Sequence, residues 1–200
     1  MSAIPDEINK LPEKVAGIDL AGRSKQPTGF CCLGEKHAWV IEVHEDHELI
    51  SLVKQCSPRV VAIDAPLSLP TTGAYRQVDL RLKKMGCPVL PPLFRGMKLL
   101  TERAIKLASM LRGMGFNVIE VHPRSTLKLL GFKEPFSLDV IARSLGFTIM
   151  SPSLSPSKHE LDAFAAAYTA WLHLQGKTLI VAEKDGSIVV PASGERGALA

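Results

Sequence analysis

The chain has 200 residues, a length that suits one domain, and 46% of them are hydrophobic, which is enough for a large core. The formal net charge is only +4, and no apolar run approaches the roughly 18–20 residues that span a membrane, so we expect no membrane segment. Residues 1–13 carry three acids and no apolar stretch, which argues against a secretory signal.

The four cysteines give no sign of a metal site. Cys31, Cys32, Cys56 and Cys87 form no CxxC pair and have no histidine at zinc-finger spacing. This pattern predicts reduced thiols in a cytoplasmic protein, and it argues against structural zinc.

The first part of the chain predicts three strands, a helix and a fourth strand. Apolar runs over residues 14–20, 28–33 and 38–43 are separated by short polar turns, so we expect an antiparallel meander. Leucine and valine at helical spacing predict a helix over residues 46–56, and a fourth strand follows over residues 59–63.

Residues 66–96 are rich in proline and loop-like, and two helices are predicted within residues 66–116. One covers residues 77–84, and an amphipathic helix covers residues 97–113. A fifth strand is expected over residues 117–121, followed by short helices near residues 124–130 and 137–145.

The C-terminal part predicts a long helix and a hairpin. Ser157 with Glu160 three residues later is a capping-box pattern, so an Ala-rich helix is expected over residues 157–175. Runs over residues 178–183 and 187–190 flank Asp185-Gly186, which favours a hairpin turn. The chain from Gly194 is expected to be a frayed tail.

This order of elements predicts an α/β fold with a mixed five-stranded sheet, in which three antiparallel strands are followed by parallel strands. Helices flank the sheet, and the hairpin completes the chain. The order is that of the ribonuclease H-like fold. We expect a single domain over residues 1–200, with a basic helical insert at about residues 66–116.

Two aspartates each end a short apolar strand. Asp19 follows Val-Ala-Gly-Ile, and Asp64 follows Val-Val-Ala-Ile. A carboxylate inside such a core is costly, whereas acids at the ends of central strands point into the crevice where ligands bind. Each also has a local alternative, because Asp19 could cap a turn into Gly22 and Asp64 could form an Asx turn before Pro66.

Three further residues extend this acidic group. Glu120 ends the fifth strand, and His159 and Asp162 are three residues apart on one face of the Ala-rich helix. The small residues that follow Asp162 would let this helix approach the sheet and bring both side chains to Asp19 and Asp64. Alternatively, Glu120 is an ion-paired structural acid, His159 is an exposed first-turn residue, and Asp162 only benefits from the helix N-terminus.

Positive charge is concentrated between residues 71 and 116, where nine Lys or Arg and two acids give a local charge of +7. We expect a polyanionic substrate to be held there, beside the acids, by Arg76, Arg81, Lys83, Lys84 and Arg95. A solvated helix face is the open alternative. Arg76 and Asp79, one helical turn apart, could also pair only with each other.

Five motifs occur in an order that resembles a known family: Gly17-Ile-Asp-Leu-Ala, Ala62-Ile-Asp-Ala-Pro-Leu, Arg76 with Asp79, Glu120-x-His-Pro and His159-x-x-Asp-Ala. Over roughly residues 14–191 the chain resembles the family called domain of unknown function 429, described as predicted nucleases of the ribonuclease H fold. The last motif is also similar to the end of the Holliday-junction resolvase pattern, in which the final helix supplies an acid or a His three residues before a metal-binding Asp.

The expected chemistry is metal-dependent hydrolysis of phosphodiester bonds in DNA or RNA. Two divalent ions about 4 Å apart can activate water and neutralise developing charge, and Mg²⁺ prefers carboxylates. We expect Asp19 to bridge two Mg²⁺ or Mn²⁺ ions, with Asp64 and Asp162 completing the two sites. His159 would bind Mn²⁺ or relay a proton, and Glu120 would be a further ligand or an acid paired with Arg76 or His122.

Two other functions remain open. A phosphotransferase of the sugar-kinase and actin type shares the fold superfamily, but it needs glycine-rich phosphate loops after the first and fourth strands. Only Gly22 follows Asp19 closely, and no glycine follows Asp64 until Gly73. A non-catalytic module would instead hold nucleic acid or a protein through the basic segment, and it would show no metal affinity at the acids.

Overall fold

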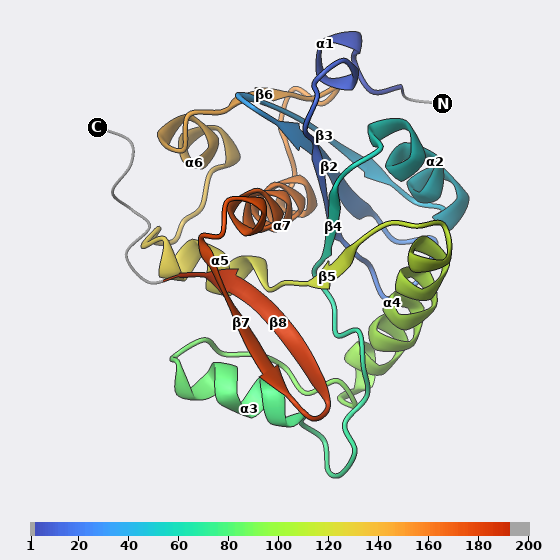
Figure 1. Ribbon diagram of the computed structural model, residues 1–200, viewed down its shortest axis with the longest axis vertical. Coiled ribbons are helices and arrows are strands. Elements are labelled where there is room, and N and C mark those ends of the chain that lie inside the picture. The colour runs from blue at the N-terminus through green and yellow to red at the C-terminus, as the bar shows by residue number, and fades with distance from the viewer. Residues whose placement is uncertain (1–2, 193–200) are drawn as a thin grey trace.

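In the computed structural model, which describes residues 3–192, a six-stranded mixed sheet lies between two layers of helices (Figure 1). The strands are β1 (Val15–Asp19), β2 (Thr28–Gly34), β3 (His37–Val43), β4 (Val60–Ile63), β5 (Val118–Glu120) and β6 (Thr148–Met150). Their order across the sheet is β5-β4-β1-β2-β3-β6. β2 is antiparallel to β1 and to β3, and the remaining pairs are parallel.

This strand order confirms the ribonuclease H-like fold, but the expected count of five strands was wrong. The additional strand, β6, pairs with the outer edge of β3. It has only three residues, so its sequence shows no alternation long enough to be recognised. The short helix α1 (Asp6–Asn9) was not expected either.

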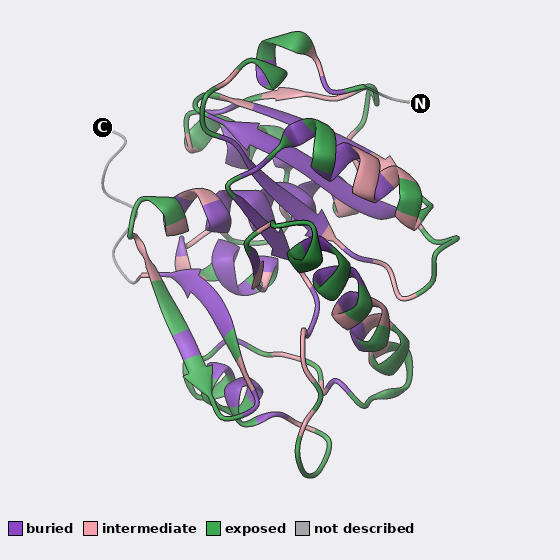
Figure 2. Ribbon diagram, turned by 45° about the vertical axis from the view of Figure 1, so that its right-hand side comes forward, coloured by how far each residue is buried: buried purple, intermediate pink, exposed green. Residues whose placement is uncertain are grey.

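Each face of the sheet packs against its own helices, because side chains alternate along the strands. On one face, α7 (Lys158–Leu174) lies against β1, β2 and β4, with α5 (Pro123–Leu129) and α6 (Leu138–Ser144) beside it. On the other face lie α2 (Asp46–Cys56) and α4 (Arg95–Gly113). Figure 2 shows the central strands buried, whereas the outward faces of α2 and α4 are exposed.

The C-terminal hairpin forms a separate two-stranded sheet from β7 (Thr178–Glu183) and β8 (Gly186–Pro191). It shares a small apolar core with α3 (Gln77–Lys84), in which Val78 and Leu82 meet Val181 and Ile188. Residues 66–116 therefore do not form one insert body, because α3 packs on the hairpin and α4 packs on the main sheet. The single-domain assignment stays a prediction, and the tail from Gly194 lies outside the described residues.

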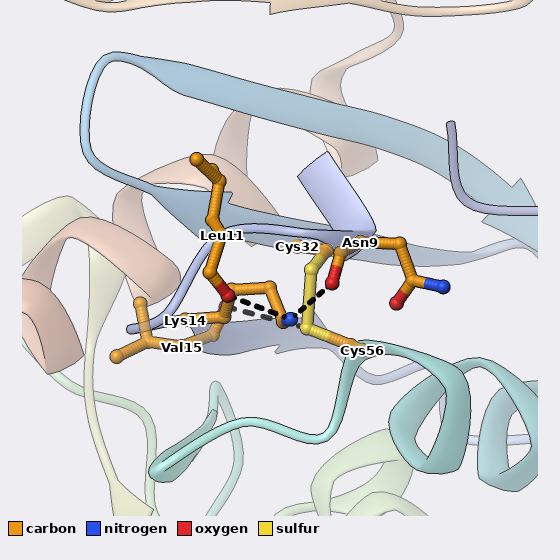
Figure 3. Close-up of a disulfide and its surroundings, with 6 residues drawn as sticks. All are labelled: Asn9, Leu11, Lys14, Val15, Cys32 and Cys56. Atoms are coloured by element: carbon orange, nitrogen blue, oxygen red, sulfur yellow. Dashed lines mark hydrogen bonds between the residues drawn. A yellow bond between two sulfur atoms is a disulfide. The ribbon is translucent and has the colours of Figure 1, made fainter. Parts of the chain in front are cut away.

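A disulfide joins Cys32 in β2 to Cys56 at the end of α2, so the expectation of reduced thiols was wrong for these two residues (Figure 3). Their Cα atoms are 6.1 Å apart, which is a normal distance for a disulfide, but nothing in the sequence brings them together. Cys31 and Cys87 are free and buried. In the same region the buried ammonium of Lys14 donates to the carbonyls of Asn9 and Leu11.

Within residues 3–192, no helix is both long enough and apolar enough to cross a membrane.

Candidate active site

Asp19 and Asp64 end two neighbouring parallel strands. β1 and β4 are paired with Ile18 opposite Ile63, and the amide of Asp64 donates to the carbonyl of Ile18 over 2.8 Å. The next position in this register places Asp19 beside Asp64. Because side chains alternate, both aspartates lie on the face that packs against α7, as Val15 and Val60 do.

Helix α7 brings His159 and Asp162 to the same face. The hydroxyl of Ser157 accepts a hydrogen bond from the amide of Glu160, and the Glu160 carboxylate accepts one from the amide of Ser157, which confirms the capping box. Nδ1 of His159 lies 2.7 Å from Oδ2 of Asp19. The expected approach of α7 to the ends of β1 and β4 is therefore confirmed.

Two glycines make this approach possible. A Cβ atom on Gly17 would lie 2.1 Å from the carbonyl oxygen of Ala163, and one on Gly29 would lie 2.0 Å from that of His159. No side chain fits at these distances, so the backbone of α7 rests directly on β1 and β2. This contact fixes the height of His159 above the sheet.

The charge of Asp19 disfavours the ionised forms of Asp64 and Asp162. Burial raises the pKa of Asp64 well above its usual value, and the neighbouring charges of Asp19 and Asp162 raise it further. Burial and repulsion from Asp19 raise the pKa of Asp162 to about 6. Burial also raises the pKa of Asp19, although the hydrogen bond from His159 opposes this shift. A nearby cation would stabilise the ionised form of each carboxylate.

These side chains fit a hard divalent cation by chemistry, since Mg²⁺ and Mn²⁺ take carboxylate oxygens. In the part of the chain that the structure describes, neither Asp64 nor Asp162 makes a side-chain hydrogen bond or an ion pair. However, no group of three or more His, Cys, Asp or Glu among residues 3–192 is close enough together to hold a metal ion as it stands. The three carboxylates would have to move closer to share an ion, so a metal site here stays a prediction.

Glu120 differs from the three aspartates because its charge is compensated. Nη1 and Nη2 of Arg76 donate to the two carboxylate oxygens of Glu120 over 2.8 and 2.5 Å, and the amide of Leu67 donates to Oε2 over 2.7 Å. Arg76 also holds Asp79, so the alternative in which these two residues pair only with each other was wrong. Burial raises the pKa of Glu120, but the bonds from Arg76 oppose this effect. The geometry favours the structural alternative for Glu120.

Of the residues expected to hold a substrate, Arg76 must be corrected. Its side chain is only 1% exposed and both sides of its guanidinium are occupied, so it cannot reach a polyanion. Arg81 pairs with Glu183 at the surface, and Lys83 lies over the ring of Tyr75. Lys84 and Arg95 are exposed. A substrate role for these four remains a prediction.

His122 caps the start of α5. It is the residue before Pro123, and its Nδ1 accepts a hydrogen bond from the amide of Ser125 over 3.3 Å. Burial lowers the pKa of His122 to about 4, so the ring is neutral at neutral pH. The alternative pairing of His122 with Glu120 is not formed, because Glu120 is bound by Arg76 instead.

The aspartates line two cavities. A cavity of about 180 Å³ is lined by Asp19, Asp64 and Glu120. A larger one, of about 490 Å³, is lined by Asp162 together with Arg124 and Lys158. Sequence reasoning missed both of these cations. The spacing of Lys158 four residues before Asp162 was a readable signal, since such residues share a helix face.

Solved structures with a similar arrangement include two of RuvC from Thermus thermophilus. One is RuvC in complex with a Holliday junction substrate, with 18% identity, coverage of 82% of this chain and 96% of that chain, and a TM-score of 0.49. The other is RuvC alone, with 17% identity, the same coverage and a TM-score of 0.46. Neither likeness is close enough to transfer the roles of residues.

No curated protein matches the chain. The family model described as protein of unknown function (DUF429) matches residues 17–138, which is more than half of the chain and includes Asp19, Asp64 and Glu120. The resemblance found in the sequence is confirmed, and the chain belongs to the DUF429 family.

Proposed function

We propose that this chain is a divalent-metal-dependent nuclease that hydrolyses phosphodiester bonds of DNA or RNA. The observation that carries the proposal is the grouping of Asp19 and Asp64, at the ends of β1 and β4, with Asp162 of α7. The charge of Asp19 raises the pKa of both Asp64 and Asp162. Glu120, by contrast, is neutralised by Arg76. Partly or fully buried acids that repel one another destabilise a metal-free fold, and binding of a cation relieves that repulsion.

Each residue has a definite task in this proposal. Bound Mg²⁺ or Mn²⁺ would supply an acidified water and neutralise charge on the phosphate. Asp19, Asp64 and Asp162 would hold the metal through their carboxylate oxygens. When Asp19 is ionised, Nδ1–H of His159 donates to it, which leaves Nε2 of the neutral ring as an acceptor that can take a proton from water.

A cleavage assay tests the proposal. Labelled single- and double-stranded DNA and RNA are incubated with the protein in Mg²⁺, in Mn²⁺ and in a chelator. We expect metal-dependent cleavage that falls about a hundredfold or more in Asp19→Asn, Asp64→Asn and Asp162→Asn. Asp6→Asn, an exposed acid on α1, is the matched control and should cleave as the wild type does. Binding without cleavage in the wild type would favour the non-catalytic module.

A further inference from the structure

The cavity of about 490 Å³ beside Asp162 combines two cations with an apolar wall. We propose that this cavity, the phosphate cleft, binds one phosphodiester group of a nucleic-acid strand next to the bond that is cleaved. Its ligands are the guanidinium of Arg124 and the ammonium of Lys158. The proposal rests on the nuclease function proposed above and names the side chains that would hold its substrate.

The two cations come from helices that are fixed against each other. Oγ1 of Thr126 in α5 lies 2.7 Å from Oγ1 of Thr169 in α7, and both threonines are fully buried. The hydroxyl of Thr169 also donates a hydrogen bond to the carbonyl oxygen of Ala165 over 2.9 Å. Arg124 is two residues before Thr126, and Lys158 is the first residue of α7. The cations therefore extend from rigid elements, which favours a defined binding geometry.

Both cations lie close to the acids. The positive charge of Lys158 favours the ionised forms of Asp19, Asp64 and Asp162. That of Arg124 favours ionised Asp162. Lys158 and Asp162 are four residues apart on α7, so they share one helix face. A phosphate held by the two cations would lie at the edge of the acidic group. The next phosphodiester bond of the strand could then reach the three aspartates.

The cleft also contains acids that an anion must displace or avoid. Oε1 of Glu134 lies 3.3 Å from Nη2 of Arg124, and Asp139 lines the same cavity. The side chains of Arg124 and Glu134 are 62% and 66% exposed, and an ion pair this open is weak. A phosphate can offer Arg124 two parallel charge-assisted hydrogen bonds in place of this single long contact.

The rest of the lining suits a nucleotide. Phe136 and Leu161 contribute apolar surface, and Phe136 is half-buried. An aromatic ring beside two cations is the combination that holds single strands, because bases stack on rings and phosphates pair with cations. A cavity of this size falls in the range that encloses small ligands, which is about 300–1,000 Å³.

The test measures binding rather than cleavage. In the Asp64→Asn background, fluorescence anisotropy follows labelled single-stranded DNA and RNA of about eight to twelve nucleotides at several salt concentrations. We expect Arg124→Ala and Lys158→Ala each to weaken binding about tenfold. Each should also make the plot of log association constant against log salt concentration less steep, by about 0.7 in the size of its negative slope. Glu134→Gln should strengthen binding, because it frees Arg124.

The control is Lys133→Ala, which removes the same charge from an exposed neighbour outside the cleft and should leave binding and slope unchanged. The phosphate cleft would be overturned if Arg124→Ala and Lys158→Ala bound the strands as tightly as Lys133→Ala does. It would also be overturned if no strand bound the protein at low salt. If a nucleoside monophosphate bound as tightly as the strands, with the same losses, the ligand would be a free phosphate ester and the strand assignment would be overturned.

These outcomes are separable from the nuclease proposal. A wild-type protein that cleaves nothing but loses binding in Arg124→Ala and Lys158→Ala would refute the nuclease activity and support the cleft. A protein that cleaves in metal but keeps full binding in both variants would support the nuclease and refute the cleft.

Discussion

Nδ1 of His159 lies 2.7 Å from Oδ2 of Asp19, although the two residues are separated by 140 positions in the sequence. This contact joins the first turn of α7 to the end of β1. It forms because Gly17 and Gly29 let the backbone of α7 rest on the sheet. The candidate site therefore depends on two residues that carry no functional group.

Gly29→Ala should separate α7 from the sheet. Its Cβ atom would lie 2.0 Å from the carbonyl oxygen of His159, which is backbone and cannot rotate away. We expect a loss of unfolding free energy of about 1–3 kcal/mol or more in urea denaturation, together with loss of the His159–Asp19 contact. Gly113→Ala, at the end of α4 with open space around it, is the control and should not destabilise the fold. Equal stability of both variants would contradict the close packing.

Asp162 should make the metal-free protein less stable as the pH rises. Its pKa is raised to about 6 in the folded state from 3.8, so between these values the folded chain holds a proton that the unfolded chain has lost. The free energy of unfolding therefore falls between about pH 4 and pH 6, by about 2–3 kcal/mol from this group alone. Above pH 6 the loss is complete.

Urea denaturation of the wild type and of Asp162→Asn, both in chelator, measures this effect as a difference. His122 contributes in the opposite direction, because its pKa is lowered to about 4 and the folded state resists protonation as the pH falls. It is present in both proteins and cancels in the comparison. Parallel pH profiles for the two proteins would show that Asp162 titrates normally.

Divalent metal should stabilise the fold through the three aspartates. At a Mg²⁺ or Mn²⁺ concentration about 100 times Kd, the gain of about 2.7 kcal/mol corresponds to a rise in Tm of roughly 5–10 °C. Asp19→Asn should remove most of this rise. Glu120→Gln should keep it, since Glu120 is already bound by Arg76 and Leu67. Loss of the rise in Glu120→Gln as well would return Glu120 to the set of metal ligands.

Removal of the Glu120 carboxylate should destabilise the protein strongly. Glu120→Ala leaves Arg76 buried with only Asp79 as its acidic partner and leaves the amide of Leu67 without its acceptor. Breaking a buried ion pair in this way costs about 3–5 kcal/mol, which urea denaturation detects. Arg81→Ala removes the exposed bridge to Glu183 and should change stability by less than about 1 kcal/mol. Similar losses in the two variants would contradict the structural role of Glu120.

The acids were predictable because strands that end in Asp have a clear local signature. Asp19, Asp64 and the pair His159 and Asp162 could be placed from apolar runs and helical spacing alone. The pairing of Glu120 with Arg76 could be named only as one of several alternatives, since the two residues are 44 positions apart in the sequence and only the fold brings them together. The positive charge of the segment therefore also predicted a substrate role for Arg76, which its burial excludes.

Other features depended on tertiary contacts that leave no local pattern. β6 is a three-residue edge strand, and the bond between Cys32 and Cys56 depends on how α2 packs on β2. The charge of Arg124 acts on Asp162 because α5 packs against α7, where Thr126 meets Thr169. The positions of the acids can therefore be predicted from the sequence, whereas the cations that surround them are identified only in the folded chain.

The most direct test of the metal-dependent site is a crystal soaked in Mn²⁺, with the ion located by anomalous scattering. We expect anomalous density between the carboxylates of Asp19, Asp64 and Asp162 and none at Glu120. The three carboxylates should lie closer together than in the metal-free protein. Mn²⁺ bound only elsewhere, with the three aspartates unmoved at a pH above 6, would contradict the metal-dependent site.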